Sequence, residues 1–430
     1  MQAGDLGLDD ARWNIAVEFA ADLCRRGEAP APDGCAGRDA SSVPAIALCV
    51  GTSERVLPPL FLGRQRLAAD SPTLRDDAVF LIASITKPIV ASAVLMLVER
   101  GRLALGDRVC DIVPEFGGSG RYAITVRHLL THTSGLPDML PNNVELRAAN
   151  SPLSAFVAGT CGVEPDFAAG RGVQYQSMGF AMLGEIVQRI TGIACRDFLR
   201  SELFAPLQMH DTELGAPDSW FEGDPPKTER IAEIRLPKEH DPASSWHWNS
   251  RYWRSLGAPW GGLLTTPADL ARFAQMMLND GRVESERVES PESRVESQNE
   301  GGQTPLALDS RASTLDSSTT HHSPLQILSP AAVRAATRNQ LEAMRSVPEE
   351  DRRCRPWGLG WRLNWPDHSA NFGDLLGPRT YGHWGATGTV MWIDPDLDLF
   401  AIILSTQPQE PHGRVLARLS NCIAAAARKG

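Results

Sequence analysis

The longest apolar stretch of the chain runs from Ala78 to Val98 and contains a single lysine, Lys87, near its centre. Its length is close to the ~20 residues that a helix needs to cross a bilayer. A lysine flanked by several hydroxyl side chains is poorly suited to the hydrocarbon interior of a membrane. The stretch therefore predicts a helix buried in the core of a globular protein, and no membrane span is expected.

The composition supports a large globular core. The chain has 430 residues, of which 42% are hydrophobic and 22% are charged, so a mostly disordered or fibrous chain is excluded. The net charge of the chain is −10, whereas a nucleic-acid binder usually has a basic surface, so no nucleic-acid partner is expected. The eight cysteines include no C-x-x-C pair, which argues against zinc-ribbon and thioredoxin sites and favours reduced thiols. The N-terminal residues show no secretory signal, which predicts a cytoplasmic protein.

The hydrophobic pattern places strands near both ends of the chain and helices between them. We expect an N-terminal helix and connector over residues 1–43, with the helix over 9–26. Further elements are predicted as a β-hairpin over 43–51 and 56–63, helices over 178–191, 267–279, 328–337 and 413–429, and strands within 357–365 and 387–405. This order predicts an α/β fold of the α+β type, in which an antiparallel sheet built from both chain ends is flanked by helices and a helical subdomain is inserted.

Residues 282–323 differ in composition from the rest of the chain. The sequence RVES occurs three times there, and Ser, Glu, Thr and Gly dominate the segment. So few large apolar side chains cannot offset the entropy lost on ordering, and we predict a disordered insertion.

The strongest chemical signal is Ser84-Ile85-Thr86-Lys87, an S-x-x-K motif at the start of the apolar helix. Residues three apart on a helix face the same way, so the serine hydroxyl and the lysine amine can meet. A serine needs a base to become a nucleophile, and burial lowers the pKa of a lysine enough for it to act as one. A lone S-x-x-K is common, so the motif needs support from its context.

That context comes from three later segments: ITVRHLLTHTSGLP at 124–137, GGLLTTPADL at 261–270 and HWGATG at 383–388. With S-x-x-K, in this order, they resemble the class C β-lactamase-related serine hydrolases, which include DD-peptidases, D-aminopeptidases and esterases. The resemblance implies a β-lactamase or penicillin-binding-protein-like catalytic domain over residues 44–425. Its α/β part would comprise about 44–80 and 350–430, and its helical part about 81–350.

The resemblance also implies a role for each matched residue. Ser84 would be the acylated nucleophile and Lys87 its base partner. Tyr175, in a Tyr175-Gln176-Ser177 segment that stands for the family's Y-x-N, would act as a phenolate or proton relay with its pKa held down by Lys87. The backbone N–H groups of Ser84 and Ala386 would form the oxyanion hole. No cofactor or metal is required.

The predicted substrate-binding residues are Ser177, His383, Trp384, Gly385 and Trp260. Ser177 replaces the family's asparagine and has a shorter side chain with one donor, so recognition of amides and β-lactams is expected to be weak. His383 holds a substrate carboxylate less reliably than the family's lysine. Trp384 would favour an apolar group, and Gly385 would let its strand approach the substrate closely.

We therefore predict a serine hydrolase that cleaves small carboxylic esters through an acyl-serine intermediate. β-Lactamase, D-amino-acid peptidase or DD-carboxypeptidase activity, acyl transfer to an alcohol, and a non-hydrolytic binding protein on the same fold remain alternatives. The partner would be a small-molecule ester or amide, and the sequence leaves the oligomeric state open.

Two other clusters allow more than one interpretation. His128 and His132 have i,i+4 spacing that suits a metal site on a helix, but in the resembled family their segment is structural, so no metal is expected. Tryptophans at 246, 248, 253 and 260 either line a substrate cleft or pack within a loop, and Trp260, beside Gly261-Gly262, is the best cleft candidate.

Overall fold

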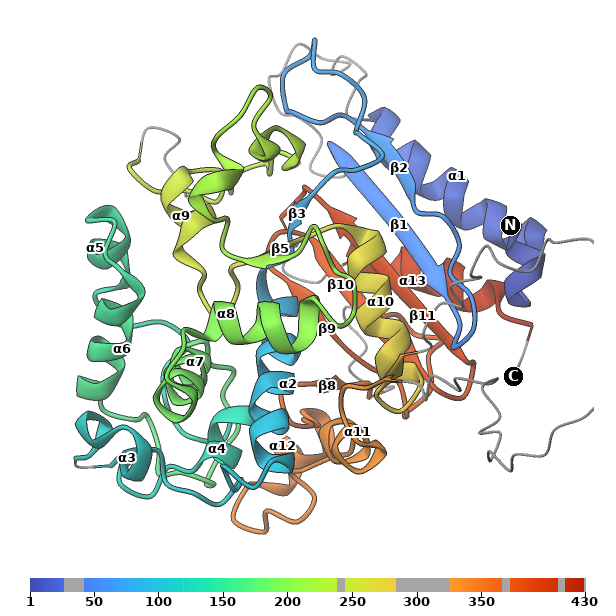
Figure 1. The fold of residues 1–430 in the computed structure, drawn as a ribbon. Coiled ribbons are helices and arrows are strands. Elements are labelled where there is room, and N and C mark those ends of the chain that lie inside the picture. Colours follow the sequence, from blue (N-terminus) through green and yellow to red (C-terminus); the bar gives the residue numbers. More distant parts are fainter. Residues whose placement is uncertain are drawn as a thin grey trace, which may run out of the picture.

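A six-stranded antiparallel sheet joins the two ends of the chain (Figure 1). The computed structural model describes residues 1–26, 42–118, 120–237, 244–283, 325–365, 372–408 and 414–428. The strand order is β2-β1-β11-β10-β9-β8. The strands are β1 (Ala45–Gly51), β2 (Leu60–Gly63), β8 (Arg362–Leu363), β9 (Tyr381–Gly385), β10 (Thr389–Asp394) and β11 (Leu399–Ser405). The predicted antiparallel sheet built from both chain ends is confirmed.

The central strands are apolar along their whole length because helices cover both faces of the sheet. In β1, Ala45, Ala47 and Cys49 face one hydrophobic core, while the alternate residues face a second core. Helices α1 (Asp10–Arg26) and α13 (Arg414–Ala426) pack together over the second core. Helix α10 (Pro267–Leu278) covers the other face, and Figure 1 shows the helical part of the molecule beyond it.

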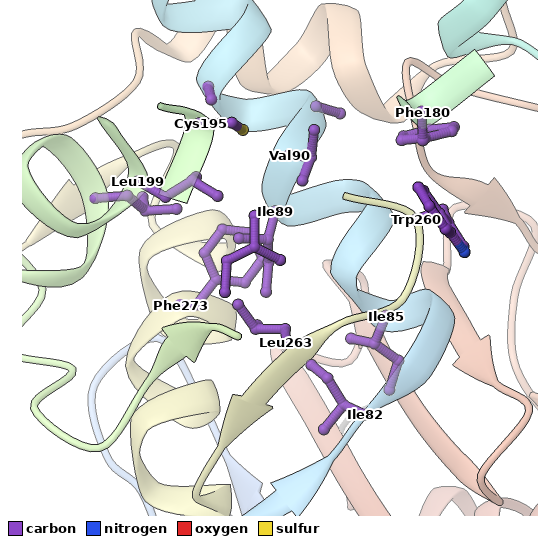
Figure 2. Close-up of a cluster of buried hydrophobic side chains, with 14 of the residues drawn as sticks. Ile82, Ile85, Ile89, Val90, Phe180, Cys195, Leu199, Trp260, Leu263 and Phe273 are labelled. Atoms are coloured by element: carbon purple, nitrogen blue, oxygen red, sulfur yellow. The ribbon is translucent and has the colours of Figure 1, made fainter. Parts of the chain in front are cut away.

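The helical part surrounds α2 (Thr86–Glu99), the apolar helix predicted from the sequence. Its Ile89 and Val90 are completely buried, and Figure 2 shows them with Phe180, Leu199 and Phe273 from three other helices. The remaining α-helices are α3 (Val109–Ile112), α4 (Val126–Leu130), α5 (Asn143–Ala148), α6 (Leu153–Gly162), α7 (Met178–Thr191), α8 (Cys195–Leu199), α9 (Arg251–Leu256), α11 (Pro330–Thr337) and α12 (Glu349–Cys354).

Short elements complete the fold. A small sheet has the order β3-β5-β4, and β6 pairs with β7. These strands are β3 (Phe80–Leu81), β4 (Glu213–Leu214), β5 (Leu263–Thr265), β6 (Arg282–Val283) and β7 (Leu325–Gln326). Single-turn helices are η1 (Ala3–Leu6), η2 (Ala83–Ile85), η3 (Pro114–Phe116), η4 (Arg200–Phe204), η5 (Asp218–Trp220) and η6 (Lys227–Arg230). No helix in these described ranges is long and apolar enough to cross a bilayer.

The structure differs from the sequence-based expectations at two places. Only Arg362–Leu363 of the strand expected over 357–365 is extended and paired. The predicted disordered insertion begins too early, because Arg282 and Val283 pair with β7. The remaining residues of the insertion lie outside the described ranges. Most of the connector before residue 43 lies outside them too. The division into an α/β part and a helical part stays a prediction.

Candidate active site

Ser84 lies in the η2 turn directly before α2, at the junction of the sheet and the helical part. The preceding residue, Ala83, has a φ of 46°, a left-handed conformation that is unfavourable for a residue with a side chain and is concentrated at functional sites. Lys87 lies in the first turn of α2, and its Nζ donates a hydrogen bond to Ser84 Oγ at 3.1 Å. The two side chains therefore meet as the S-x-x-K spacing predicts.

Lys87 is fully buried, and no acidic side chain among the described residues forms an ion pair with it. Its Nζ donates to the Trp260 carbonyl oxygen at 2.8 Å and to Ser177 Oγ at 3.3 Å. Burial lowers the pKa of the amine to about 7, against the opposing effect of the Asp138 charge. At neutral pH a large share of Lys87 is therefore unprotonated and able to accept the serine proton.

Tyr175 also lies beside the nucleophile, but its predicted ionisation is wrong. Lys87 Nζ lies over the Tyr175 ring, 4.7 Å from its centroid, where the contact is with the ring face. Burial raises the pKa of the phenol above its usual range, although a side-chain hydrogen bond with Ser84 opposes the rise. Tyr175 is therefore a protonated phenol at neutral pH rather than a phenolate, and its alternative role as a proton relay stays a prediction.

His383 is buried and does not line the cavity, so its prediction as a substrate-binding side chain is corrected. Its ring is fully buried and lies 6.0 Å from Tyr175 and 5.3 Å from Trp384, centroid to centroid. Its Nδ1 donates to the Trp384 carbonyl oxygen at 2.7 Å. Burial lowers the pKa of His383 to about 3, so the imidazole is neutral and supports its neighbours by packing.

His132 is a structural residue of the same layer. Its ring stacks on Tyr175 at 4.8 Å and contacts Trp357 at 4.1 Å, and its Nδ1 accepts a hydrogen bond from the Gln176 backbone N–H at 3.0 Å. His128 instead caps α4 through Thr125. The two histidines thus have separate protein partners, and the described ranges hold no group of three metal-ligating side chains.

Hydrogen bonds connect the residues that follow β9 to the segment directly before η2, the turn that carries Ser84. Thr387 Oγ1 donates to the Leu81 carbonyl oxygen at 2.7 Å, and Thr389 Oγ1 donates to that of Ile82 at 2.9 Å. A Cβ at Gly385 would collide with the Ile82 carbonyl oxygen, so only glycine permits this approach. The arrangement holds Ala386 against the mouth of the cavity that contains Ser84.

A cavity of about 200 Å³ opens over Ser84. Its lining residues are Leu81, Ala83, Ser84, Asp138, Met139, Arg147, Tyr175, Ser177, Trp248, Trp253, Trp260, Gly261, Trp384 and Ala386. Of the residues predicted from the sequence, it brings together Ser84, Tyr175, Ser177, Trp260, Trp384 and Ala386, with Lys87 directly behind them.

Sequence reasoning missed five other lining residues, Leu81, Ala83, Asp138, Met139 and Arg147. Asp138 directly follows the 124–137 segment, and its place beside this motif could have identified it as a candidate site residue. Arg147 belongs to no motif and could not have been found from the sequence. Three of the four clustered tryptophans line the cavity, which supports the cleft interpretation of that run.

Comparisons with known proteins agree with this geometry. Residues 35–425 match a family model described as β-lactamase. The chain is 33% identical to penicillin-binding protein 4 of Amycolatopsis lactamdurans over 48% of this chain and 52% of that protein. It is 36% identical to the esterase EstB of Burkholderia gladioli over 32% of this chain and 39% of that protein. The matches to these curated relatives thus span about half of their length or less.

The fold agrees over a longer range than the sequence does. A penicillin-binding-protein homologue from Caulobacter crescentus superposes with a TM-score of 0.66, covering 98% of this chain and 99% of that structure at 22% identity. The family match extends over most of the residues, and the shared fold covers nearly the whole chain. The chain therefore belongs to the β-lactamase family.

Proposed function

We propose that this protein is a serine hydrolase that cleaves small carboxylic esters through an acyl-Ser84 intermediate. The observation that carries the proposal is the hydrogen bond of 3.1 Å between Ser84 Oγ and a buried, ion-pair-free Lys87. A protein that only binds a ligand has no need of a buried amine whose pKa is lowered beside a serine.

In the proposed mechanism, each of these residues has a defined part in the proton transfers. Ser84 Oγ attacks the ester carbonyl carbon and passes its proton to the neutral amine of Lys87. The Ser84 and Ala386 backbone N–H groups are proposed to bind the oxyanion. Tyr175, kept protonated by burial, donates its proton to the leaving alkoxide and regains one from Lys87. Water then attacks the acyl-Ser84 carbonyl by the reverse proton transfers and releases the acid.

The cavity wall favours an ester over an amide. Ser177 Oγ accepts a hydrogen bond from Lys87 and is shorter than the asparagine that the family pattern has at this position, so it offers little to a substrate amide. Trp248, Trp260 and Trp384 give the wall a large aromatic surface that suits an apolar acyl or alcohol group. The esterase name of one relative points the same way.

The test combines active-site labelling with turnover. A fluorophosphonate is expected to add one adduct, detected by intact mass, to the wild-type protein and none to Ser84→Ala. Wild-type protein should hydrolyse p-nitrophenyl butyrate faster than a chromogenic cephalosporin. Absence of an adduct together with absence of ester turnover contradicts the proposal and favours a non-hydrolytic binding protein.

Cleavage of β-lactams or D-amino-acid peptides is the second candidate, favoured by the relative named as a penicillin-binding protein. Ser177→Asn separates the two, because an asparagine amide provides the reach and the donors that the serine lacks. We expect this variant to raise cephalosporin turnover relative to ester turnover by about 10-fold, the value of one good hydrogen bond. A wild-type protein that already prefers the cephalosporin overturns our ranking.

A further inference from the structure

The cavity wall contains a buried cation that the proposed ester hydrolysis does not use. Arg147 belongs to α5, lines the cavity that contains Ser84, and is 7% exposed. Burying an arginine without an acidic partner is unfavourable, so such residues are generally explained by a partner that the free protein lacks.

Two aromatic rings hold the guanidinium in place. Its central carbon lies 4.6 Å from the ring centroid of Trp246 and 4.6 Å from that of Trp253. These contacts fix the plane of the guanidinium but satisfy none of its N–H groups. A planar, fixed set of donors is suited to a planar acceptor such as a carboxylate.

The polar contacts of Arg147 leave that capacity free. Within the described ranges it makes no ion pair, and one terminal nitrogen donates only to the Met139 sulfur, a weak acceptor, at 3.4 Å. Its Nε is buried without a hydrogen-bond partner. Asp138 lines the same cavity from an exposed position. Burial lowers the pKa of the Arg147 guanidinium to about 10, against the opposing electrostatic effects of Tyr252 and Asp138, so Arg147 stays charged at neutral pH.

Neighbouring groups in the wall are also donors without acceptors. The indole Nε1 atoms of Trp253 and Trp260 are buried and lack a hydrogen-bond partner. Figure 2 shows the Trp260 nitrogen at the end of the ring that is turned away from the apolar cluster. Indole and guanidinium nitrogens only donate, so these groups add donors beside the Asp138 carboxylate, which is the charged acceptor of the same wall.

Resting on the ester hydrolysis proposed above, we propose that the substrate carries a carboxylate and that Arg147 binds it. His383 takes the place of the family's lysine, but it is buried and neutral and does not line the cavity. A substrate carboxylate would therefore need a different cation, and Arg147 is a cation in the cavity wall. The substrate class is thus a monoester with a free carboxylate elsewhere in the molecule.

The carboxylate can belong to either side of the ester bond, and two pairs of substrates distinguish them. Mono-(4-nitrophenyl) glutarate and its methyl ester place it on the acyl side, and 4-butyryloxybenzoate and its methyl ester place it on the alcohol side. In one pair we expect the wild-type kcat/KM of the acid to exceed that of the neutral ester by at least about 10-fold, the value of one hydrogen bond to a charged group.

Arg147→Gln is expected to abolish this preference, so that kcat/KM for the acid and for its neutral ester differ by less than about 3-fold in the variant, and Arg147→Lys to restore the preference only in part. Arg254→Gln is the matched control, because Arg254 is an arginine of the neighbouring α9 that does not line the cavity. Equal treatment of acid and neutral ester by the wild-type protein in both pairs overturns the inference and leaves the proposed function intact.

A binding experiment decides the case in which no ester is turned over and the proposed function fails. Calorimetric titration of Ser84→Ala with monomethyl glutarate should show binding that is at least about 10-fold weaker in the Ser84→Ala, Arg147→Gln double variant. Equal affinities in the two proteins contradict the role of Arg147. Thermal melting of each variant shows that it is folded.

Discussion

The protonation states of the site depend on burial more than on nearby charge. Lys87 loses its preference for the charged form because desolvation disfavours an ammonium whose hydrogen-bond partners are two hydroxyls and a carbonyl, all uncharged. The same desolvation keeps Tyr175 neutral, since the charged form of a phenol is its anion. One environment thus yields a base and an acid side by side.

A pH profile tests this assignment. The pKa of Lys87 is lowered to about 7, and only the unprotonated amine accepts the serine proton. We therefore expect kcat/KM for a neutral p-nitrophenyl ester to fall about 10-fold for each pH unit below that pKa and to level off above it. The buried imidazoles of His132 and His383 have pKa values too low to produce this limb.

Lys87→Arg provides the control, because an arginine stays charged and cannot accept the proton. We expect it to lower kcat/KM by about 100-fold or more, the usual contribution of a general base. A wild-type profile that is flat between about pH 5 and about pH 9 is incompatible with Lys87 as the base.

Local spacing was sufficient to predict which residues meet at Ser84. Ser84 in η2 and Lys87 in the first turn of α2 are three residues apart in consecutive helical turns, so their contact follows from local helical geometry. The pKa of Tyr175 and the position of His383 depend on side chains from distant segments, and both predictions failed for that reason. Arg147 is functional only through its place in the cavity wall, and no sequence pattern marks it.

At the scale of elements, the position of β9 against η2 decides whether the proposed oxyanion donors, the N–H groups of Ser84 and Ala386, can converge. The two threonine hydrogen bonds to the Leu81 and Ile82 carbonyls fix this separation. Gly385 allows it, because the Ile82 carbonyl oxygen occupies the space that a Cβ would fill. Gly385 was predicted to let its strand approach the substrate closely. In the structure, the close neighbour of Gly385 is the backbone of Ile82, just before the turn that carries Ser84.

Gly385→Ala is expected to force β9 away from η2. We expect a loss of about 1–3 kcal/mol in the free energy of unfolding, as for other overpacked sites, measured by urea denaturation. Fluorophosphonate labelling of Ser84 should slow by about 10-fold or more, since one displaced oxyanion donor has at least that effect.

Gly162→Ala is the matched control, because a Cβ at Gly162 meets no atom and its φ is unstrained. It should leave the labelling rate within experimental error and should not lower the free energy of unfolding, because alanine is favoured over glycine by about 0.5–1 kcal/mol within a helix. Equal behaviour of the two alanine variants contradicts the close approach as a requirement for reactivity.

At the scale of the whole molecule, the fold depends on pairing between segments that are far apart in the chain. Strand β1 pairs with β11 from Ile46–Ser405 to Gly51–Phe400, so the N-terminal hairpin is incomplete without the C-terminal strands. Periodicity predicted that both ends contribute strands, because the strands are apolar. It did not give their order, which arises from long-range contacts. The cytoplasmic location stays a prediction.

The pairing of β6 with β7 indicates where the chain can be shortened. Residues 282–323 were predicted to be a disordered insertion, and the strands that flank most of this segment pair with each other, Val283 opposite Leu325. The chain thus leaves and re-enters the described fold at adjacent positions. A two-residue Asn-Gly turn is the commonest connection between such antiparallel neighbours.

Replacing residues 284–324 with Asn-Gly is therefore expected to preserve the fold and the site. Loop shortening lowers the entropy of closure only slightly, so the melting temperature should change by less than about 5 °C. Ester turnover should stay within about 3-fold of the wild-type value, because Ser84, Lys87 and the cavity wall lie outside the segment. A second variant, in which a Gly/Ser linker of equal length replaces the same residues, separates the effect of length from that of sequence. Loss of cooperative melting or of turnover in both variants shows that the segment contributes to the fold or the site, and contradicts its assignment as a dispensable insertion.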